Sequence, residues 1–214
     1  MAIKRRAVND DQKEQRKQAI IDAAWELFQQ NDYDAVNVKD VAHAINLAKG
    51  TVYVYFKTKE ALFLAVQMQQ FDAWFDTVDA ALPNVHDIDS LVALFTSTLE
   101  ERPHLTRLFA ILHTTLERNI DYDDALSFKQ TLYQRIAHTG QLMEQFIDVL
   151  PANSGAQILM DTYAITIGIQ HMSDAAPVVH DVLRDHPELT AFEVNFKSSL
   201  GALVKTYLMG KCLT

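Results

Sequence analysis

Cysteine is nearly absent from this chain: the only one among its 214 residues is Cys212. A single thiol cannot form an internal disulfide, nor can it build a cysteine-based metal site alone, which fits a reducing compartment. Glycine (6) and proline (5) are also scarce, while apolar residues make up 49% of the composition. This composition is typical of a soluble, well-packed and mostly helical protein, and it argues against disorder away from the ends.

Long apolar runs are missing as well. No stretch of about 18 uncharged apolar residues occurs, so no membrane-spanning helix is expected. The basic start from Met1 to Asp10 is not followed by an apolar segment, which excludes a signal peptide. We therefore expect a cytoplasmic protein without a membrane partner.

Positive charge is in deficit over the whole chain, whose net charge is −9. Because Lys and Arg supply most of the affinity for phosphate, this balance by itself opposes nucleic-acid binding. The deficit is unevenly distributed, however. Residues 1–60 hold 10 Lys and Arg against 9 Asp and Glu, a net charge of +1, so the remainder carries −10. Only the N-terminal part is suited to approach a polyanion.

The N-terminal part contains a series of local helix signals. Apolar residues recur at helical spacing from Ala19 to Phe28, and the stretch from Asn31 to Asp34 then interrupts the pattern as a turn. Asn37 is suited to cap a second helix. Asn46 follows where a left-handed residue is useful, and Asn tolerates that conformation better than any residue except Gly. A third helix can start near Ala48.

The remainder of the chain predicts long helices and no strands. From Lys59 one helix runs to about Ala81, where Leu82-Pro83-Asn84 ends it. Because no alternating pattern and no internal repeat occurs, the predicted fold class is all-α. Further helical patterns cover about 87–101, 104–118, 122–149, 155–173 and 188–209.

The two short helices between Asn37 and Phe56 have the layout of a helix-turn-helix, in which the second helix enters the major groove of DNA. The stretch VKDVAHAINLAKGTVYVYFKTKEALF, residues 38–63, strongly resembles the DNA-binding signature of the TetR family of bacterial regulators. The resemblance implies a three-helix DNA-binding domain over residues 1–58 and a larger helical domain for effector binding and dimerisation over residues 59–214. The matching positions are Val41-Ala42, Lys49-Gly50-Thr51-Val52-Tyr53, Tyr55-Phe56 and Lys59-Glu60.

Residues of the second short helix are chemically suited to DNA. Gly50 lets the start of this helix come close to the phosphate backbone, and Thr51 is small enough to reach a base edge. Tyr53 and Tyr55 can offer hydroxyls to phosphates, and lysines are natural phosphate contacts. The expected partner is a palindromic operator in double-stranded DNA. The predicted DNA contacts are Asn37, Lys39, Lys49, Gly50, Thr51, Tyr53, Tyr55 and Lys59.

Three positions depart from the family pattern, which usually has Thr, Gly and Ser where this chain has Asn37, Asn46 and Ala48. The two asparagines remain chemically suitable. Ala48 can neither cap the recognition helix nor donate to a phosphate, so part of the affinity must come from elsewhere. A basic arm from Lys4 to Arg6 is a further candidate that could follow the DNA groove.

The last two predicted helices, 155–173 and 188–209, are unusually apolar. A single copy of the chain would struggle to bury all of their side chains, and Gly168 and Gly201 permit close helix approach. Pairing both helices with a second copy would form a four-helix interface like those of the family, giving a homodimer. Two-fold pairing also places two recognition helices about 34–36 Å, or a multiple of one DNA turn, apart. The alternative is that these helices belong to the core of one copy.

A mixed group of large apolar and polar residues has the profile of a cavity for an apolar or amphiphilic effector. Aromatic residues and Met at helical spacing can equally fill a core. Release of the operator on effector binding, with the helix from Lys59 transmitting occupancy, would make the chain a repressor, as is usual in the family. The members of the group are Phe109, His113, Glu117, Phe128, Met143, Phe146 and Tyr163.

Two other functions remain open. His113 and Glu117 lie one turn apart and could serve an all-α enzyme, but phosphate-loop, nucleophile-elbow and zincin motifs do not occur. The acidic run that begins at Asp121 lacks the glycine and distal Glu of a calcium loop. We therefore expect no catalytic residue, no metal and no cofactor. A helical adaptor that has lost DNA binding is the second alternative. Three histidines are the only other candidate metal ligands, and we expect no metal there either: His171, His180 and His186.

Overall fold

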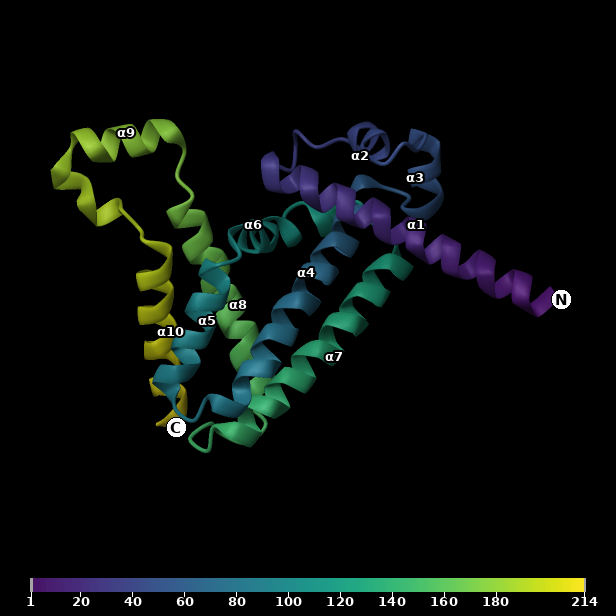
Figure 1. The fold of residues 1–214 in the computed structure, drawn as a ribbon. Coiled ribbons are helices and arrows are strands. Elements are labelled where there is room, and N and C mark those ends of the chain that lie inside the picture. The colour runs from purple at the N-terminus through teal and green to yellow at the C-terminus, as the bar shows by residue number, and fades with distance from the viewer. Residues whose placement is uncertain (1, 214) are drawn as a thin grey trace. The chain divides into compact units, whose positions relative to one another are not determined.

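The computed structural model describes the backbone of residues 2–213 and the side chains of residues 11–213. All regular elements in that range are helices, which confirms the predicted all-α class (Figure 1). The backbone of residues 2–10 continues the first helix, whereas the side chains of the predicted basic arm, Lys4 to Arg6, lie outside the described residues. No helix in the described range is long and apolar enough to cross a membrane.

The helices differ widely in length. The α-helices are α1 (Ala2–Gln30), α2 (Val38–Ala44), α3 (Lys49–Tyr55), α4 (Lys59–Ala81), α5 (Ile88–Glu100), α6 (Pro103–Leu112), α7 (Tyr122–Phe146), α8 (Gly155–Ser173), α9 (Pro177–Asp185) and α10 (Phe196–Cys212). The short 3-10 segments are η1 (Leu82–Asn84), η2 (Leu116–Arg118) and η3 (Pro187–Phe192).

Several bounds agree with the sequence pattern. α4 begins at Lys59 and ends at Ala81, and η1 follows at the expected Leu-Pro-Asn turn. α8 covers residues 155–173, as predicted. α7 begins at the predicted residue but ends at Phe146, before the predicted residue 149. Strong local signals therefore placed most helix starts correctly.

Two predicted helices are divided in the structure. The pattern over 104–118 forms α6, which ends at Leu112, and then only the short segment η2. The pattern over 188–209 forms η3 and then α10, which begins at Phe196. Asn195 causes this restart, because its side chain accepts a hydrogen bond from the backbone N–H of Ser198 (3.0 Å) and so caps a new helix.

α9 lies between the predicted helices 155–173 and 188–209, where no helix was predicted. Pro177 occupies the start of the helix, where its fixed φ and missing N–H favour helix initiation. None of the α9 residues is buried. The helix is therefore set by its local sequence and not by a hydrophobic core.

The chain divides into two compact units. The first, the head unit, comprises Met1–Gln69 and Leu112–Phe128. The second, the body unit, comprises Gln70–Ile111 and Lys129–Thr214. α4 is one continuous helix that supplies its first residues to the head unit and its remaining residues, from Gln70, to the body unit.

A small core fixes the helices of the head unit. Phe28 of α1 and Phe63 of α4 meet edge to face, with ring centroids 5.7 Å apart. Ala42 of α2 and Val52 of α3 are almost fully enclosed, at 1% and 0% exposure. Val52 is the buried residue of α3, so one side chain anchors this helix and the others are available to a partner.

The body unit is built by closer helix contacts. α10 packs against α5 and α8, and the Tyr207 hydroxyl donates to the carboxylate of Asp161 on α8 at 2.5 Å. α7 and α8 approach at Gly140 and Gly155, where a Cβ on Gly155 would lie 2.1 Å from the Gly140 carbonyl oxygen. Beside this crossing, the Glu144 carboxylate accepts from the Gly155 N–H (2.8 Å). The close approach therefore depends on two glycines and one carboxylate.

Candidate DNA-binding site

The turn between α2 and α3 has the geometry that the sequence predicts. Asn37 caps α2, because its side-chain oxygen accepts from the backbone N–H of Lys39 (3.0 Å) and of the next residue (3.1 Å). Asn46 adopts the left-handed conformation, with φ of 54°. The Leu47 N–H then donates to the Ala42 carbonyl (2.8 Å), which closes the end of α2. These local bonds fix where α3 begins.

α3 presents most of its side chains outward. Ala48, at the N-cap, makes no side-chain hydrogen bond, as expected for alanine. Lys49 is exposed, and its ammonium lies 5.6 Å from the centre of the Tyr53 ring, which is itself 41% exposed. Thr51 is half-buried. A Cβ built on Gly50 would meet nothing within 4 Å, so the packing of the fold does not require glycine at this position.

The two other lysines predicted to contact DNA differ in availability. Lys39 of α2 is exposed. Lys59 is half-buried at the start of α4, where its ammonium donates to the Tyr33 carbonyl and lies 3.8 Å from the centre of the Tyr33 ring. Burial lowers the pKa of Lys59. Lys59 therefore stabilises the head unit from within, and it can reach a phosphate only by leaving Tyr33.

The turn that follows α3 is held by a later stretch of the head unit. Lys57 pairs with Asp121, and this hydrogen bond raises the pKa of the Lys57 ammonium. The Thr58 hydroxyl donates to the Asn119 carbonyl (2.9 Å), and the Asn119 amide donates to the Glu60 carboxylate (3.2 Å). The paired residues are 59 to 64 positions apart, so no local sequence signal marked these contacts.

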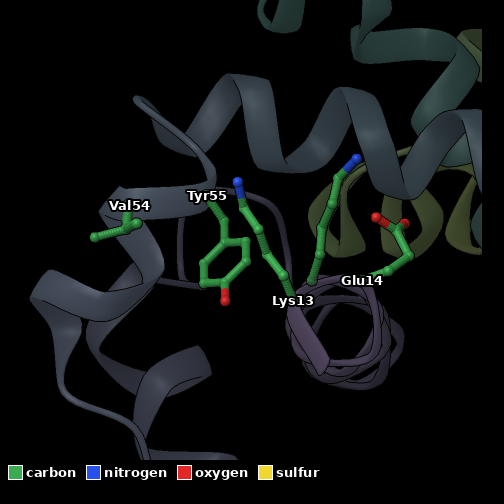
Figure 2. A pocket seen from close by; sticks show the side chains of 5 residues that line it. Lys13, Glu14, Val54 and Tyr55 are labelled. Carbon is green, nitrogen blue, oxygen red and sulfur yellow. The ribbon is translucent and has the colours of Figure 1, made fainter. Parts of the chain in front are cut away.

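A groove of about 410 Å³ opens between α1 and α3 (Figure 2). Lys13, Glu14 and Lys17 line it from α1, and Val54 and Tyr55 line it from α3. Figure 2 shows Lys13 extending from α1 toward the ring of Tyr55. The sequence singled out only the tyrosine, because the lysines lie in a polar stretch that no recognised pattern marks.

The seven residues predicted to line an effector cavity are divided between the two units. His113, Glu117 and Phe128 belong to the head unit, because the stretch that contains them packs there. The His113 ring and the Glu117 carboxylate form a hydrogen bond (Nδ1–Oε2 3.0 Å) at partly exposed positions one helical turn apart. Such a pair is typical of a surface hydrogen bond.

The other four lie in the body unit. Phe109 of α6 stacks on Phe71 of α4, with ring centroids 4.9 Å apart, and meets Tyr163 of α8 edge to face at 5.0 Å. Met143 of α7 is fully buried, and Phe146 is half-buried at the end of the same helix. Phe71, which the sequence did not single out, completes the aromatic cluster.

Comparison with known proteins places this architecture in a family. Residues 20–66 match the family model described as bacterial regulatory proteins, tetR family, and residues 68–212 match the tetracyclin repressor-like C-terminal domain. The HTH-type transcriptional regulator RutR of Escherichia coli (strain K12) is 27% identical over 99 residues, which is 45% of this chain and 47% of that protein. The fatty acid metabolism regulator protein of Bacillus subtilis (strain 168) is 38% identical over 63 residues, 28% of this chain and 32% of that protein.

Two further matches cover very different shares of the chain. The uncharacterized HTH-type transcriptional regulator YuxN of Bacillus subtilis is 33% identical over 64 residues, 30% of this chain and 22% of that protein. A crystal structure of a tetR-family transcriptional regulator from Streptomyces coelicolor aligns with 92% of this chain and 90% of that chain, at 17% identity and a TM-score of 0.46. The chain thus spans less than half the length of the curated relatives it matches. Because the two family models match residues 20–66 and 68–212, the chain belongs to the TetR family of helix-turn-helix transcriptional regulators.

Proposed function

We propose that this protein is a repressor that binds a palindromic operator as a homodimer and leaves it when a small apolar or amphiphilic effector binds. The DNA-binding part is assigned to residues 1–58 and the sensing and pairing part to residues 59–214. The observation that carries the proposal is the composition of α3. Val52 is the buried residue of this helix, and Lys49 and Tyr53 are exposed.

The outward residues of α3 have no structural task that explains them. Gly50 has open space around its missing Cβ, so its value lies in what approaches from outside. Lys49 and Tyr53 are exposed side by side, which suits contacts with phosphate and with the edges of the major groove. Thr51 and Tyr55 are half-buried, so packing on one side restricts their positions. Together with Asn37, Lys39 and Lys59, these residues form the proposed operator contacts.

Pairing is supported by the exposed apolar side chains of α8 and α10, helices that contact each other in one copy. Met160 on α8 is 44% exposed, and Leu203 and Met209 on α10 are 49% and 50% exposed. Gly168 faces open space, which permits close approach of another helix. A second copy seated on these two helices would remove the apolar side chains from water.

Effector sensing is supported by two features that involve α4. Phe71 belongs to the aromatic cluster with Phe109 and Tyr163. In the head-unit part of α4, the fully buried amide of Gln67 has, among the residues that the structure describes, no hydrogen-bond partner at either its nitrogen or its oxygen. An unpaired buried polar group costs about 1–3 kcal/mol, a cost that a polar group of an effector would remove. α4 begins directly after the turn that follows α3, so a shift of α4 would move α3 as well. If the effector favoured one of two positions of α4 by about 1–3 kcal/mol, operator affinity would change 5- to 150-fold.

The test of the proposal starts with selection of fragments of the source genome by the purified protein, followed by footprinting. We expect a dimer to protect an inverted repeat, with binding that weakens steeply as salt rises. A Thr51→Ala, Tyr53→Ala variant should lose this specific binding. Tyr133→Ala is the matched control, because Tyr133 is an exposed tyrosine of α7. Specific binding that survives the double variant at full strength would overturn the assignment of α3.

A further inference from the structure

The groove between α1 and α3 has the chemistry of an anion site. Lys13 and Lys17 are one turn apart on α1, so both side chains leave the same face of the helix. Among the residues whose side chains the structure describes, neither lysine has an ion-pair partner. Tyr55 supplies a hydroxyl from the opposite wall. Two cations and one neutral donor thus line the same groove.

The place of the groove suggests which anion it binds. Its second wall is formed by Val54 and Tyr55, the last residues of the helix proposed to enter the major groove. A helix in a groove about 12 Å wide has a sugar-phosphate backbone on each side. Lys13 and Lys17 of α1 line the same groove as the end of α3, so a backbone that flanks α3 on this side would pass near them.

We infer that Lys13, Lys17 and Tyr55 form a binding site for a backbone phosphodiester of the operator DNA. This inference rests on the proposed function, since it needs α3 to lie in the major groove. The ammonium groups of Lys13 and Lys17 neutralise the phosphate, and the Tyr55 hydroxyl donates to one of its oxygens. The site supplies affinity without sequence information. It also compensates for Ala48, which cannot donate to a phosphate.

Glu14 gives the site an internal control. Its carboxylate lines the same groove as Lys13 and Lys17, so it repels the phosphate that they attract. Removing its charge should therefore strengthen DNA binding, whereas removing the charge of either lysine should weaken it. Net charge alone gives the same signs, so the groove is supported only if these effects exceed that of a charge change at an exposed α1 residue outside it.

The experiment measures fluorescence anisotropy of two duplexes of equal length, one selected from the genome and one scrambled, at several KCl concentrations. Lys13→Gln combined with Lys17→Gln should weaken binding to both duplexes by the same factor, about tenfold or more at low salt. It should also reduce the slope of log affinity against log salt by about one, because the two lysines neutralise a single phosphodiester. Glu14→Gln should tighten binding to both duplexes about twofold or more.

The control is Arg16→Gln, which removes one positive charge from an exposed residue of α1 that does not line the groove. This variant should change affinity less than Lys13→Gln does. Each protein is also titrated with inorganic phosphate alone, to separate a DNA phosphodiester from a free phosphate. Tight binding of free phosphate that the lysine variants abolish would overturn the DNA assignment.

Failure of the inference can be told apart from failure of the proposed function. Wild-type protein that prefers no duplex contradicts the proposed function. Wild-type protein that prefers the selected duplex, together with a Lys13→Gln, Lys17→Gln variant of unchanged affinity and salt slope, contradicts only the groove. Circular dichroism should be the same for all variants, because three of the four substituted α1 side chains, at 13, 14 and 16, are exposed, Lys17 is half-buried, and glutamine is a good helix former.

Discussion

The head unit and the body unit leave opposite kinds of side chain uncovered. α3 in the head unit exposes Lys49 and Tyr53 around one buried anchor. α10 in the body unit exposes Leu203 and Met209. Net charge also differs, since residues 1–60 of the head unit carry +1, its residues 112–128 carry −3, and the body unit carries −7. The surface of α3 suits a polyanion, and the surface of α10 suits an apolar partner. The two proposed partners, operator DNA and a second copy of the chain, would therefore bind different units.

Charging the exposed face of α10 has the largest expected effect. Leu203→Glu combined with Met209→Glu would place two unpaired carboxylates in the proposed pairing surface. We expect the dissociation constant of the dimer to rise about a thousandfold, because an uncompensated buried charge is strongly unfavourable. Both side chains are half exposed in one copy, so the helical content should not change. Sedimentation velocity over a range of concentrations measures the constant.

The matched control for this double variant is Tyr133→Glu. Tyr133 is also an exposed large side chain, at 71%, but it lies on α7 and outside the proposed pairing helices. The control should associate like the wild type. If the double variant associates as tightly as the control, the body unit does not pair through α10 and the comparison between the two surfaces fails.

Two glycines sharpen the comparison at single positions. Gly155→Ala in the body unit would place a Cβ 2.1 Å from the Gly140 carbonyl oxygen, and we expect it to lower the free energy of unfolding by about 3 kcal/mol. Gly50→Ala in the head unit meets open space, so it should leave stability unchanged to within about 1 kcal/mol. It should instead weaken operator binding about tenfold, because the added methyl group faces the DNA backbone.

The two tryptophans allow each unit to be followed in urea. Trp25 belongs to the head unit and Trp74 to the body unit. In a Trp25→Phe background, fluorescence reports on Trp74 alone, which is buried and donates to the Thr98 hydroxyl (3.0 Å). Gly155→Ala should shift this transition to lower urea. A Gly155→Ala protein as stable as the wild type would mean that α7 and α8 do not need the close approach.

The parts of the head unit that the sequence predicted are those set by neighbouring residues. The Asn37 cap, the left-handed Asn46 and the start of α4 at Lys59 each depend on chemistry within a few positions. A long family signature covered the same stretch. The outward direction of α3 followed from one apolar anchor, Val52, at a known spacing from Phe56.

What the sequence missed depends on residues far apart in the chain. The stretch from Leu112 to Phe128 packs in the head unit through contacts such as Lys57 with Asp121, and no local pattern encodes them. For the same reason the predicted effector residues are divided between the units. The break before α10 did have a local signal, the Asn195 cap, but the continuous apolar spacing on both sides concealed it.

α2 and α3 are neighbouring helices of equal length in the head unit, and they differ in whether a side chain caps the first turn. Asn37→Ala removes the acceptor for two backbone N–H groups of α2, and we expect it to lower the free energy of unfolding by about 1 kcal/mol. Ala48→Ser adds a cap that α3 lacks and should raise this free energy by about 0.5 kcal/mol. Urea unfolding followed at Trp25 measures both. Equal stability of the two variants would show that local capping does not limit the head unit.

The smallest expected effect comes from releasing Lys57, which pairs with an acidic side chain of the later stretch, residues 112–128. Lys57 follows α3 directly, and its side chain is 74% exposed although it pairs with Asp121. The Asp121 carboxylate also accepts a hydrogen bond from the backbone N–H of Asp124 (2.9 Å) at the start of α7. Asp121→Asn removes the charge but keeps a side-chain oxygen for this hydrogen bond, so the start of α7 is preserved.

With its partner neutralised, Lys57 becomes available to a phosphate, and we expect affinity for both selected and scrambled duplexes to rise about two- to threefold at low salt. The gain should vanish as salt rises, because exposed charges are screened over about 8–10 Å. Asp123→Asn removes the same charge from an exposed neighbour that Lys57 does not pair with, and it should have a smaller effect. If the two variants bind DNA equally, the gain reflects net charge alone. If only Asp121→Asn binds more tightly, the ion pair restrains DNA binding, and the acidic part of the chain limits the affinity of the head unit through this single contact.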